Sequence, residues 1–299
     1  MAYQGWAYRW RYFLVKGATT ARRWGSRPPR GFRLAVHAMF QNEAPYLAEW
    51  IDHHLALGFD HLFLTNDGST DHYLSVLQPY RDKGLVTLEE ARSDLDFFAR
   101  EEWHKNQIIR QQRRHYRWVA FLDTDEFLFC PQVDLRAWLK AHSATPGYVL
   151  NWFVFGTSGV ETLPEGEDLR SVLRYRFPHS HHEHRNVKAL VQPWKGFRFF
   201  NQNPHYPQYS PLARLRHPSG RRFHPARPRI ERYPLSINHY WYRTEHFYRE
   251  VKKPRRAFFQ GEPRPAHIEA WHRRESNRVL DLGLAQRKAS PRGVEHLGD

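Results

Sequence analysis

The sequence predicts an α/β fold with a largely parallel sheet, and three observations support this prediction. From residue 33 to residue 122, apolar runs of strand length alternate with segments whose apolar residues recur at helical spacing. The run at 119–122 is continuously apolar, as expected of a strand that is buried on both faces. Polar loops follow several of these runs, which places those loops at one edge of a parallel sheet.

The elements are expected in a regular order at first. Strands are expected at 33–40, 61–65, 85–88 and 119–122, with helices at 45–57, 72–82 and 96–114 between them. After Glu126 the order changes, and 164–234 is irregular and rich in proline, histidine and arginine. In this second half we expect strands at 148–155 and near 172–177, 187–191 and 196–200, and a short strand or turn at 237–241. Helices are expected at 135–139 and 244–259, and a last amphipathic segment around 266–284.

Length and composition fit a globular chain that buries one sizeable core. The 299 residues are 40% hydrophobic and 26% charged. No apolar stretch approaches the ~20 residues of a membrane-spanning helix, and no secretory signal peptide is evident. Cys130 is the only cysteine, so the sequence offers no intrachain disulfide, which fits a reducing cytosol. The expected location is the cytoplasm.

The formal net charge of +15 points to an anionic partner. No helix-turn-helix, zinc-finger or RNA-recognition pattern is present, so nucleic acid is not expected. The basic residues gather outside 34–130, which favours membrane phosphates or a phosphorylated acceptor, although a solvated basic surface also explains them. In an arm at 1–31, tryptophans alternate with arginines, as in a short helix lying on the inner face of an anionic membrane. A partly ordered leader is the alternative.

The acids that follow the fourth predicted strand indicate a metal site. Asp123 and Asp125 come directly after an apolar run, at a sheet edge where α/β proteins bind ligands. Two carboxylates there can hold a hard divalent cation, Mn²⁺ or Mg²⁺, that in turn holds the diphosphate of a sugar nucleotide. Glu126 either faces the metal or caps the next segment, and a plain surface turn is the alternative for all three acids.

Two more polar loops are expected at the same edge. Asn42 and Glu43 follow the first strand, and 66–71, which contains Asn66 and Asp67, follows the second. Their side chains can hydrogen-bond a nucleotide base and ribose while the metal holds the phosphates. Each loop also suits an ordinary helix cap or turn, so it is their convergence on one edge that favours a binding site.

Several segments, in order, resemble glycosyltransferases related to families 2 and 92. They are 41–51, 66–71, 121–128, 152–159 and 238–241. The resemblance covers roughly 33–285. It departs from the family at Gln41, where a lysine is usual, and at the basic stretch 206–234, which has no recognisable counterpart.

The resemblance implies a GT-A type fold and a metal-dependent inverting transfer. It divides the chain into a nucleotide-binding half at 32–130, an acceptor half at 131–285 and a tail at 286–299. It also implies roles for individual residues. The metal residues would be Asp123, Asp125 and His239, with His205 as second candidate, and the donor-binding residues would be Asn42, Glu43, Asn66, Asp67, Gln107, Asp123 and Lys188.

The catalytic base is the least determined residue. Inversion needs a carboxylate or histidine to take the proton of the acceptor hydroxyl. Glu161 follows the glycine-containing loop 156–159 and is one candidate, and Glu183, within the histidine-rich run 179–184, is the other. That run has no matching cysteines or well-spaced histidines for a transition metal, which favours a solvated loop.

The predicted function is transfer of a sugar from a nucleotide-sugar donor to a glycan or lipid-linked acceptor, in the synthesis of a surface polysaccharide. A non-catalytic carbohydrate- or nucleic-acid-binding protein with a degenerate transferase fold is the alternative, and the intact Asp123 and Asp125 argue against it. A metal-dependent phosphodiesterase or nucleotidyltransferase would need more metal-binding acids on adjacent strands than the sequence offers.

Overall fold

The computed structural model describes residues 27–201, 203–207, 214–254 and 265–284. Most of the predicted N-terminal arm, 1–26, and the whole predicted tail, 286–299, lie outside the described residues. Among the described residues, no helix is both long and apolar enough to cross a membrane.

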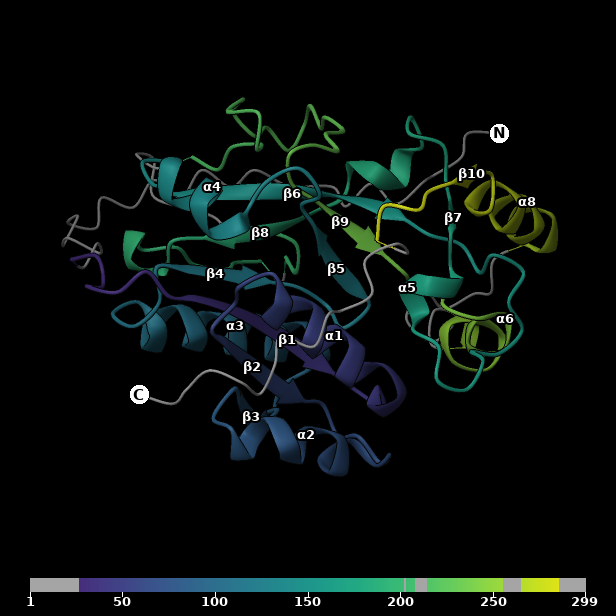
Figure 1. Ribbon diagram of the computed structural model, residues 1–299, viewed down its shortest axis with the longest axis horizontal. Helices are drawn as coiled ribbons and strands as arrows, with labels where there is room; N and C mark the ends of the chain where they lie inside the picture. The colour runs from purple at the N-terminus through teal and green to yellow at the C-terminus, as the bar shows by residue number, and fades with distance from the viewer. Residues whose placement is uncertain (1–26, 202, 208–213, 255–264, 285–299) are drawn as a thin grey trace.

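The first half of the chain alternates strands and helices, as the sequence predicted (Figure 1). The elements are β1 (Leu34–Phe40), α1 (Ala44–Ala56), β2 (His61–Asn66), α2 (Tyr73–Asp82), β3 (Val86–Glu90), α3 (Phe97–Gln112) and β4 (Trp118–Phe121). Local chemistry sets the helix ends. Asp96 caps α3 by accepting a hydrogen bond from the Ala99 amide at 3.0 Å, and Gly58 follows α1 with a φ of +94°.

The second half adds shorter elements and four strands that complete the sheet. They are β5 (Glu126–Phe129), α4 (Leu135–Ala141), β6 (Gly147–Val154), α5 (Leu169–Val172), β7 (Tyr175–Arg176), the 3₁₀ turns η1 (His182–Arg185) and η2 (Pro193–Lys195), β8 (Val187–Val191), β9 (Ser236–His239), α6 (Glu245–Phe247), the π-helical turn η3 (Tyr248–Lys252), α8 (Ala266–Ser276) and β10 (Val279–Leu280). β7 and β10 form a separate two-stranded sheet.

The main sheet has the strand order β3-β2-β1-β4-β8-β6-β9-β5. The four strands of the first half are parallel to one another, and so are β6 and β9. The β4–β8, β8–β6 and β9–β5 pairs are antiparallel. This confirms the predicted α/β class with a mostly parallel sheet.

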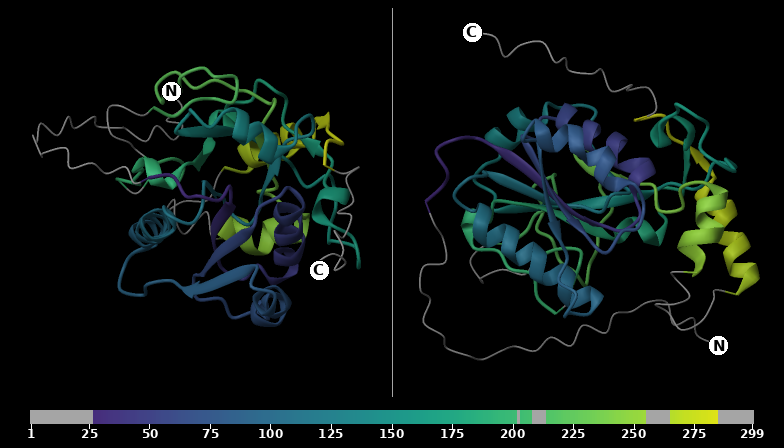
Figure 2. Two further views of the ribbon diagram at one scale, coloured as in Figure 1. Left: turned by 60° about the vertical axis from the view of Figure 1, so that its left-hand side comes forward. Right: turned by 90° about the horizontal axis from the view of Figure 1, so that it is seen from below.

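Helices cover both faces of the sheet, and the side-chain alternation of the strands explains why both faces are apolar. Along β1, Leu34, Val36 and Ala38 pack into the core beneath α1, α2 and α4, whereas Ala35 packs into the core beneath α3. Figure 2 shows α1 and α3 on opposite sides of the strands. Because β1 pairs in parallel with β2 and β4, the carboxyl ends of these three strands lie at the same edge of the sheet.

Two short segments differ from the sequence-based expectation. The expected strand at 196–200 does not form, because Asn106 of α3 satisfies the backbone there: its side chain donates to the Phe199 carbonyl at 3.0 Å and accepts from the Phe199 amide at 2.8 Å. The expected amphipathic segment around 266–284 is helical only as far as Ser276, and β10 follows it.

Candidate functional site

The two polar loops predicted to share a sheet edge do meet there. Asn42 adopts a left-handed conformation with a φ of +55°, which asparagine tolerates, and its side chain accepts a hydrogen bond from the Thr70 amide at 2.8 Å. Asp71 accepts one from the Ala44 amide at 2.8 Å, at the start of α1. These contacts join the loop after β1 to the loop after β2.

The predicted donor-binding residues of the second loop have partners of their own. The Asn66 side chain donates to Glu90 at 2.8 Å and to the Tyr73 hydroxyl at 3.0 Å, which makes Asn66 part of the framework of the loop. Asp67 forms an ion pair with Arg100 of α3. The edge therefore carries an anchored carboxylate whose counter-ion comes from the neighbouring helix.

Asp123 lies at the end of β4 and is held by two buried groups. Its Oδ1 atom is 2.7 Å from the ammonium of Lys188, which is only 1% exposed. Glu126 accepts a hydrogen bond from the Asp123 amide at 2.9 Å and lies 3.6 Å from the same ammonium. Burial raises the pKa of Glu126 well above its usual value. Glu126 was expected either to face the metal or to cap the next segment, and the structure instead shows it holding the preceding turn, which carries Asp123.

Asp125 is the most constrained carboxylate of the site. His239 Nε2 lies 3.3 Å from Oδ1, and Lys252 Nζ lies 2.7 Å from Oδ2. Burial acts to raise the pKa of Asp125, but Lys252 and His239 outweigh it and hold the pKa well below the usual value. The antiparallel pairing of β5 with β9 produces this arrangement, because it sets His239 opposite Glu126.

The sequence did not indicate the role of Arg243. Its side chain is fully buried, forms an ion pair with Glu43 and lies over the Tyr46 ring with 4.0 Å between the guanidinium carbon and the ring centroid. Burial raises the pKa of the Glu43 carboxyl, and Arg243 opposes that shift. Arg243 has a positive φ of +53° that no local sequence pattern would have predicted.

Two histidines contact the Trp152 ring near the acids. The ring centroid of Trp152 is 4.3 Å from that of His239 and 5.2 Å from that of His205. Burial lowers the pKa of His205 to about 3, so this imidazole is neutral. His239, which contacts Asp125, is the better placed of the two expected metal ligands.

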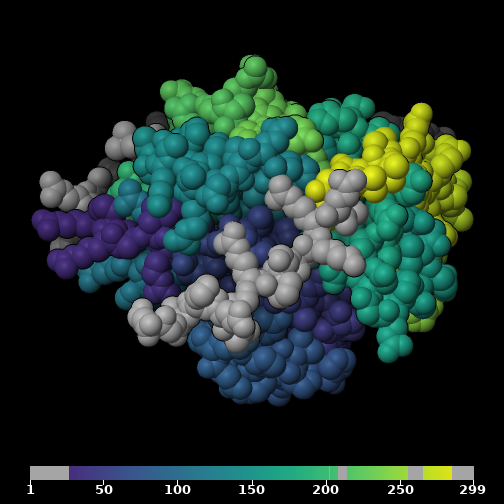
Figure 3. All heavy atoms as spheres, in the orientation of Figure 1, coloured from purple at the N-terminus to yellow at the C-terminus, as the bar shows by residue number. Residues whose placement is uncertain are grey.

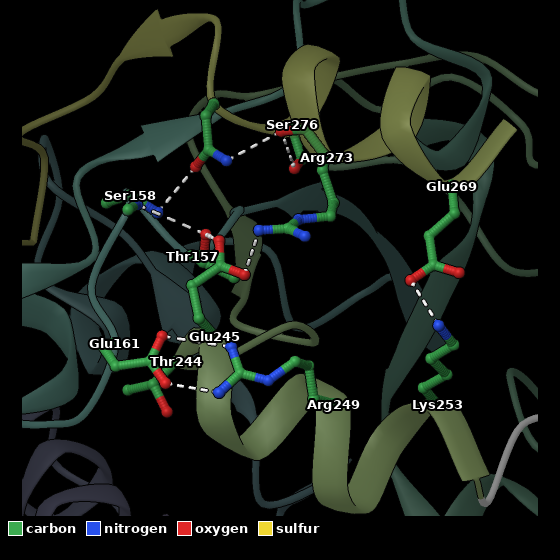
Figure 4. A network of polar contacts seen from close by, with 12 residues as sticks. Thr157, Ser158, Glu161, Thr244, Glu245, Arg249, Lys253, Glu269, Arg273 and Ser276 are labelled. Atoms are coloured by element: carbon green, nitrogen blue, oxygen red, sulfur yellow. Dashed lines mark hydrogen bonds and ion pairs between the residues drawn. The ribbon is translucent and has the colours of Figure 1, made fainter. Parts of the chain in front are cut away.

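Three predicted site residues have partners elsewhere. Gln107 accepts a hydrogen bond from Arg110 along the exposed side of α3. Glu161 forms an exposed ion pair with Arg249 of η3 (Figure 4). Glu183 bonds to Asn186 at 3.0 Å within η1.

Two histidines of the histidine-rich run are packed rather than solvated, whereas His179 and His182 are exposed. His181 stacks on Phe177 with 3.8 Å between ring centroids, and the fully buried His184 packs on Phe153 at 4.6 Å. These two aromatic contacts, and not solvent, surround the imidazoles. The expectation of a solvated loop is therefore corrected for His181 and His184.

The donor set at the edge suits a divalent cation in part. Within the described ranges, no group of three or more histidine, cysteine, aspartate or glutamate side chains is arranged to hold a metal ion. Asp125 and His239 nevertheless offer a carboxylate and an imidazole 3.3 Å apart. Mn²⁺ and Mg²⁺ often take only one or two protein ligands when phosphates and water complete the shell. The imidazole makes this pair fit Mn²⁺ better than Mg²⁺, which prefers oxygen ligands. Asp123 is instead bound to Lys188.

A sequence model of glycosyltransferase family 92 matches residues 30–263, which include every element of the edge. The chain belongs to glycosyltransferase family 92. The sequence-based prediction of a glycosyltransferase is thus confirmed at the level of family, and the sheet confirms the predicted α/β class.

Plant proteins of the family are among the relatives. A family 92 protein of Ricinus communis is 25% identical over 187 residues, which are 58% of this chain and 31% of that protein. One of Oryza sativa subsp. japonica is 28% identical over 171 residues, 54% of this chain and 27% of that protein. The chain therefore spans about a third of the length of these relatives.

Two bacterial proteins are among the solved structures that match part of the chain. One is S. aureus TarS 1-349, with a TM-score of 0.35 and 16% identity, covering 54% of this chain and 47% of that chain. The other is glucosyl-3-phosphoglycerate synthase from Mycobacterium tuberculosis in complex with Mn²⁺, UDP and glucosyl-3-phosphoglycerate. Its TM-score is 0.26 with 14% identity, over 42% of this chain and 45% of that chain.

Proposed function

We propose that this chain transfers a sugar, with inversion, from a nucleoside diphosphate-sugar to a glycan or lipid-linked acceptor. The observation that carries the proposal is the Asp125–His239 pair at the carboxyl edge of the sheet in a family 92 chain. A sheet edge of this kind is where α/β proteins bind nucleotides.

The donor would lie across the loops that meet at this edge. Asn42, Glu43 and Asp67 would contact the nucleoside from the 32–130 half, and the 131–285 half would contact the acceptor. Lys188 and Lys252, each 2.7 Å from a carboxylate of the edge, bring positive charge to the position proposed for the diphosphate. This charge would stabilise the phosphate oxygens as the bond to the sugar breaks.

Asp125 and His239 would hold the Mn²⁺ or Mg²⁺ ion. When bound, such an ion neutralises charge on the departing diphosphate as a Lewis acid. Lys252 now contacts the Oδ2 atom of Asp125, whereas the ion would bind the Oδ1 atom that faces His239. Its ammonium would remain close enough to pair with the diphosphate.

A carboxylate on the far side of the sugar must accept the proton of the acceptor hydroxyl. Glu161 and Glu183 stay the two candidates. Glu161 is the one connected to the edge, because its backbone carbonyl accepts a hydrogen bond from the His246 amide at 3.0 Å, three residues after the buried Arg243.

Thermal stability with and without nucleotide and metal tests the proposal. A UDP- or GDP-sugar present at 100 times its dissociation constant stabilises the fold by about 2.7 kcal/mol. We expect this stabilisation to require Mn²⁺ and to vanish in Asp125→Asn. Asp94→Asn is the control, because Asp94 lies in an exposed ion pair with Arg92.

Two results would overturn the proposal. One is the same nucleotide stabilisation in wild type and Asp125→Asn. The other is tight RNA binding with no response to any sugar nucleotide, which would favour the nucleic-acid-binding alternative. The melting temperature of unliganded Asp125→Asn shows whether that variant is folded.

A further inference from the structure

A second concave site lies in the basic stretch 206–234, which has no counterpart in the family resemblance. It is a groove of about 530 Å³, within the usual range for small-ligand sites. Segments far apart in the sequence form it, namely the end of β7, residues 219–221, residues 230–233 and Asp281 after β10. In Figure 3 the 214–234 segment, in light green, forms the upper rim of the molecule.

The groove lies on the other side of β9 from the candidate active site. Arg232, on the groove side, donates to the Asn238 side chain at 2.6 Å, whereas the next residue, His239, contacts Asp125. Successive side chains of a strand point to opposite faces. A ligand in this groove would therefore not occupy the donor position.

The floor of the groove is rigid and positively charged. Arg232 is 7% exposed, and its guanidinium carbon lies 3.8 Å from the centroid of Phe129 and 4.4 Å from that of Phe153. Arg232 and Arg176 share one carboxylate, that of Asp281, at 3.0 Å and 2.6 Å. One negative charge between two guanidinium groups leaves an excess of positive charge on the floor.

The rim adds groups that suit a sugar. The Tyr233 side chain is 50% exposed, so its ring is open to stacking against a ligand. Glu231 accepts a hydrogen bond from the Ser219 hydroxyl at 2.8 Å, and both can also bond to sugar hydroxyls. Arg221 is exposed and has no ion pair within the described part of the chain. Three arginines and two carboxylates thus line the groove, together with the rings of Tyr233 and His179.

We propose that this groove binds a glycan that carries an acidic group, a carboxylate or a phosphate, on one of its sugars. The acidic group would pair with Arg221 and with the positive charge of Arg176 and Arg232 that Asp281 does not neutralise. A sugar ring would stack on Tyr233. That this glycan is the acceptor or product of the enzyme rests on the proposed function. Binding of the glycan to the groove does not rest on that function, because the binding needs no sugar-nucleotide donor.

Calorimetry with the full chain tests the groove at a fixed salt concentration. The probes are a uronate oligosaccharide, a phosphate-bearing oligosaccharide and a neutral oligosaccharide of the same length. We expect one of the two acidic probes to bind about tenfold more tightly than the neutral one. Which of them binds distinguishes a carboxylate from a phosphate. Arg221→Ala and Tyr233→Ala should each weaken that binding by about tenfold.

Arg227→Ala is the matched control, because it removes the same charge from an exposed position in the same stretch, outside the groove. Equal losses in Arg221→Ala and Arg227→Ala would mean that only the net charge matters and would overturn the proposal. So would equal binding of the neutral probe, or no binding of either acid. Asp125→Asn should keep the binding, which separates failure of the groove from failure of the proposed donor site.

Discussion

At the scale of single residues, the most consequential contact is the one between Lys252 and Asp125. An ammonium 2.7 Å from Oδ2 neutralises the carboxylate that should ligate the metal. The Lys252 side chain is only 13% exposed and lies 5.6 Å from the centroid of the Trp241 ring, so water screens this ion pair little. An ion on the Oδ1 atom and this ammonium on the Oδ2 atom are two cations on one carboxylate, so each weakens the binding of the other.

Removing the competitor should strengthen metal binding. In Lys252→Met, the side chain keeps its length but loses its charge, and we expect Mn²⁺ to bind roughly tenfold more tightly in the absence of nucleotide. Calorimetry or the electron paramagnetic resonance of free Mn²⁺ measures this affinity directly, without reference to activity.

Lys253→Met is the control for that measurement. Lys253 is the next residue, and its ammonium pairs with Glu269 at 3.2 Å on a half-exposed side chain. It should leave the affinity for Mn²⁺ unchanged. Weaker Mn²⁺ binding in Lys252→Met would show that the lysine supports the metal site instead of competing for it.

The residues of the edge differ in how far the sequence predicted them. Asp123 and Asp125 follow a recognisable strand, and His239 was indicated by its place in a motif, so all three were expected. Arg243 and Lys252 reach the edge through long side chains from an irregular segment after β9. Their contacts depend on tertiary packing, which periodicity along the sequence does not encode.

At the scale of elements, the loop after β6 is held against two C-terminal segments (Figure 4). A Cβ atom on Gly156 would come within 2.6 Å of the Ser276 carbonyl oxygen, so only glycine allows α8 to lie this close. Thr157 donates to Glu245 at the start of α6, and Arg273 of α8 pairs with the same carboxylate. Glu161 lies in this loop, and its backbone carbonyl accepts a hydrogen bond from the His246 amide of α6, so its position depends on α6 and α8 together.

This anchoring makes the role of Glu161 testable. If Glu161 is the base, Glu161→Gln should lower kcat by about 10²- to 10⁴-fold. Arg249→Met removes the same exposed ion pair but keeps the carboxylate, so it should retain most of the activity. Steady-state release of nucleotide in the presence of acceptor measures both variants.

Both variants should keep the melting temperature of the wild type closely, because exposed ion pairs add little stability. Equal losses of kcat in Glu161→Gln and Arg249→Met would assign the pair a structural role. Full activity of Glu161→Gln would leave Glu183 as the candidate.

The elements that the sequence predicted best are those with a strong local signal. The strands and helices of the first half have regular apolar periods and were all expected in order. β5 was not expected as a strand, because its four residues pair only with β9, far along the chain. A long-range contact also explains why no strand forms at 196–200. The Asn106 side chain of α3 makes the hydrogen bonds to the Phe199 backbone that a neighbouring strand would otherwise make.

At the scale of the whole molecule, several histidines are buried within the fold and stay neutral. Burial lowers the pKa of His54 and of His184 to about 3, and that of His181 to about 4. His54 lies between α1 and β5, with its ring 4.4 Å from that of Trp50, whereas His184 packs under β6. Buried neutral histidines thus lie in separate parts of the core, so low pH should lower the free energy of unfolding of the whole fold.

The sign of this effect follows from proton binding. Below about pH 6.5 an unfolded histidine takes up a proton, while the folded His54 does so only near pH 3. The free energy of unfolding should therefore fall as the pH is lowered from 6.5 toward 3, with each such histidine contributing about 1.4 kcal/mol per pH unit. Burial raises the pKa of Glu126, which has the opposite effect on the pH dependence of stability. A single histidine variant therefore isolates the contribution of that histidine better than the pH dependence of the wild type does.

In His54→Gln, the free energy of unfolding, measured by chemical denaturation between about pH 4.5 and 6, should depend on pH with a slope smaller by about that amount. His224→Gln, at an exposed position, is the control and should leave the slope unchanged. An equal slope in His54→Gln and wild type would mean that the folded chain protonates His54 as readily as the unfolded chain does.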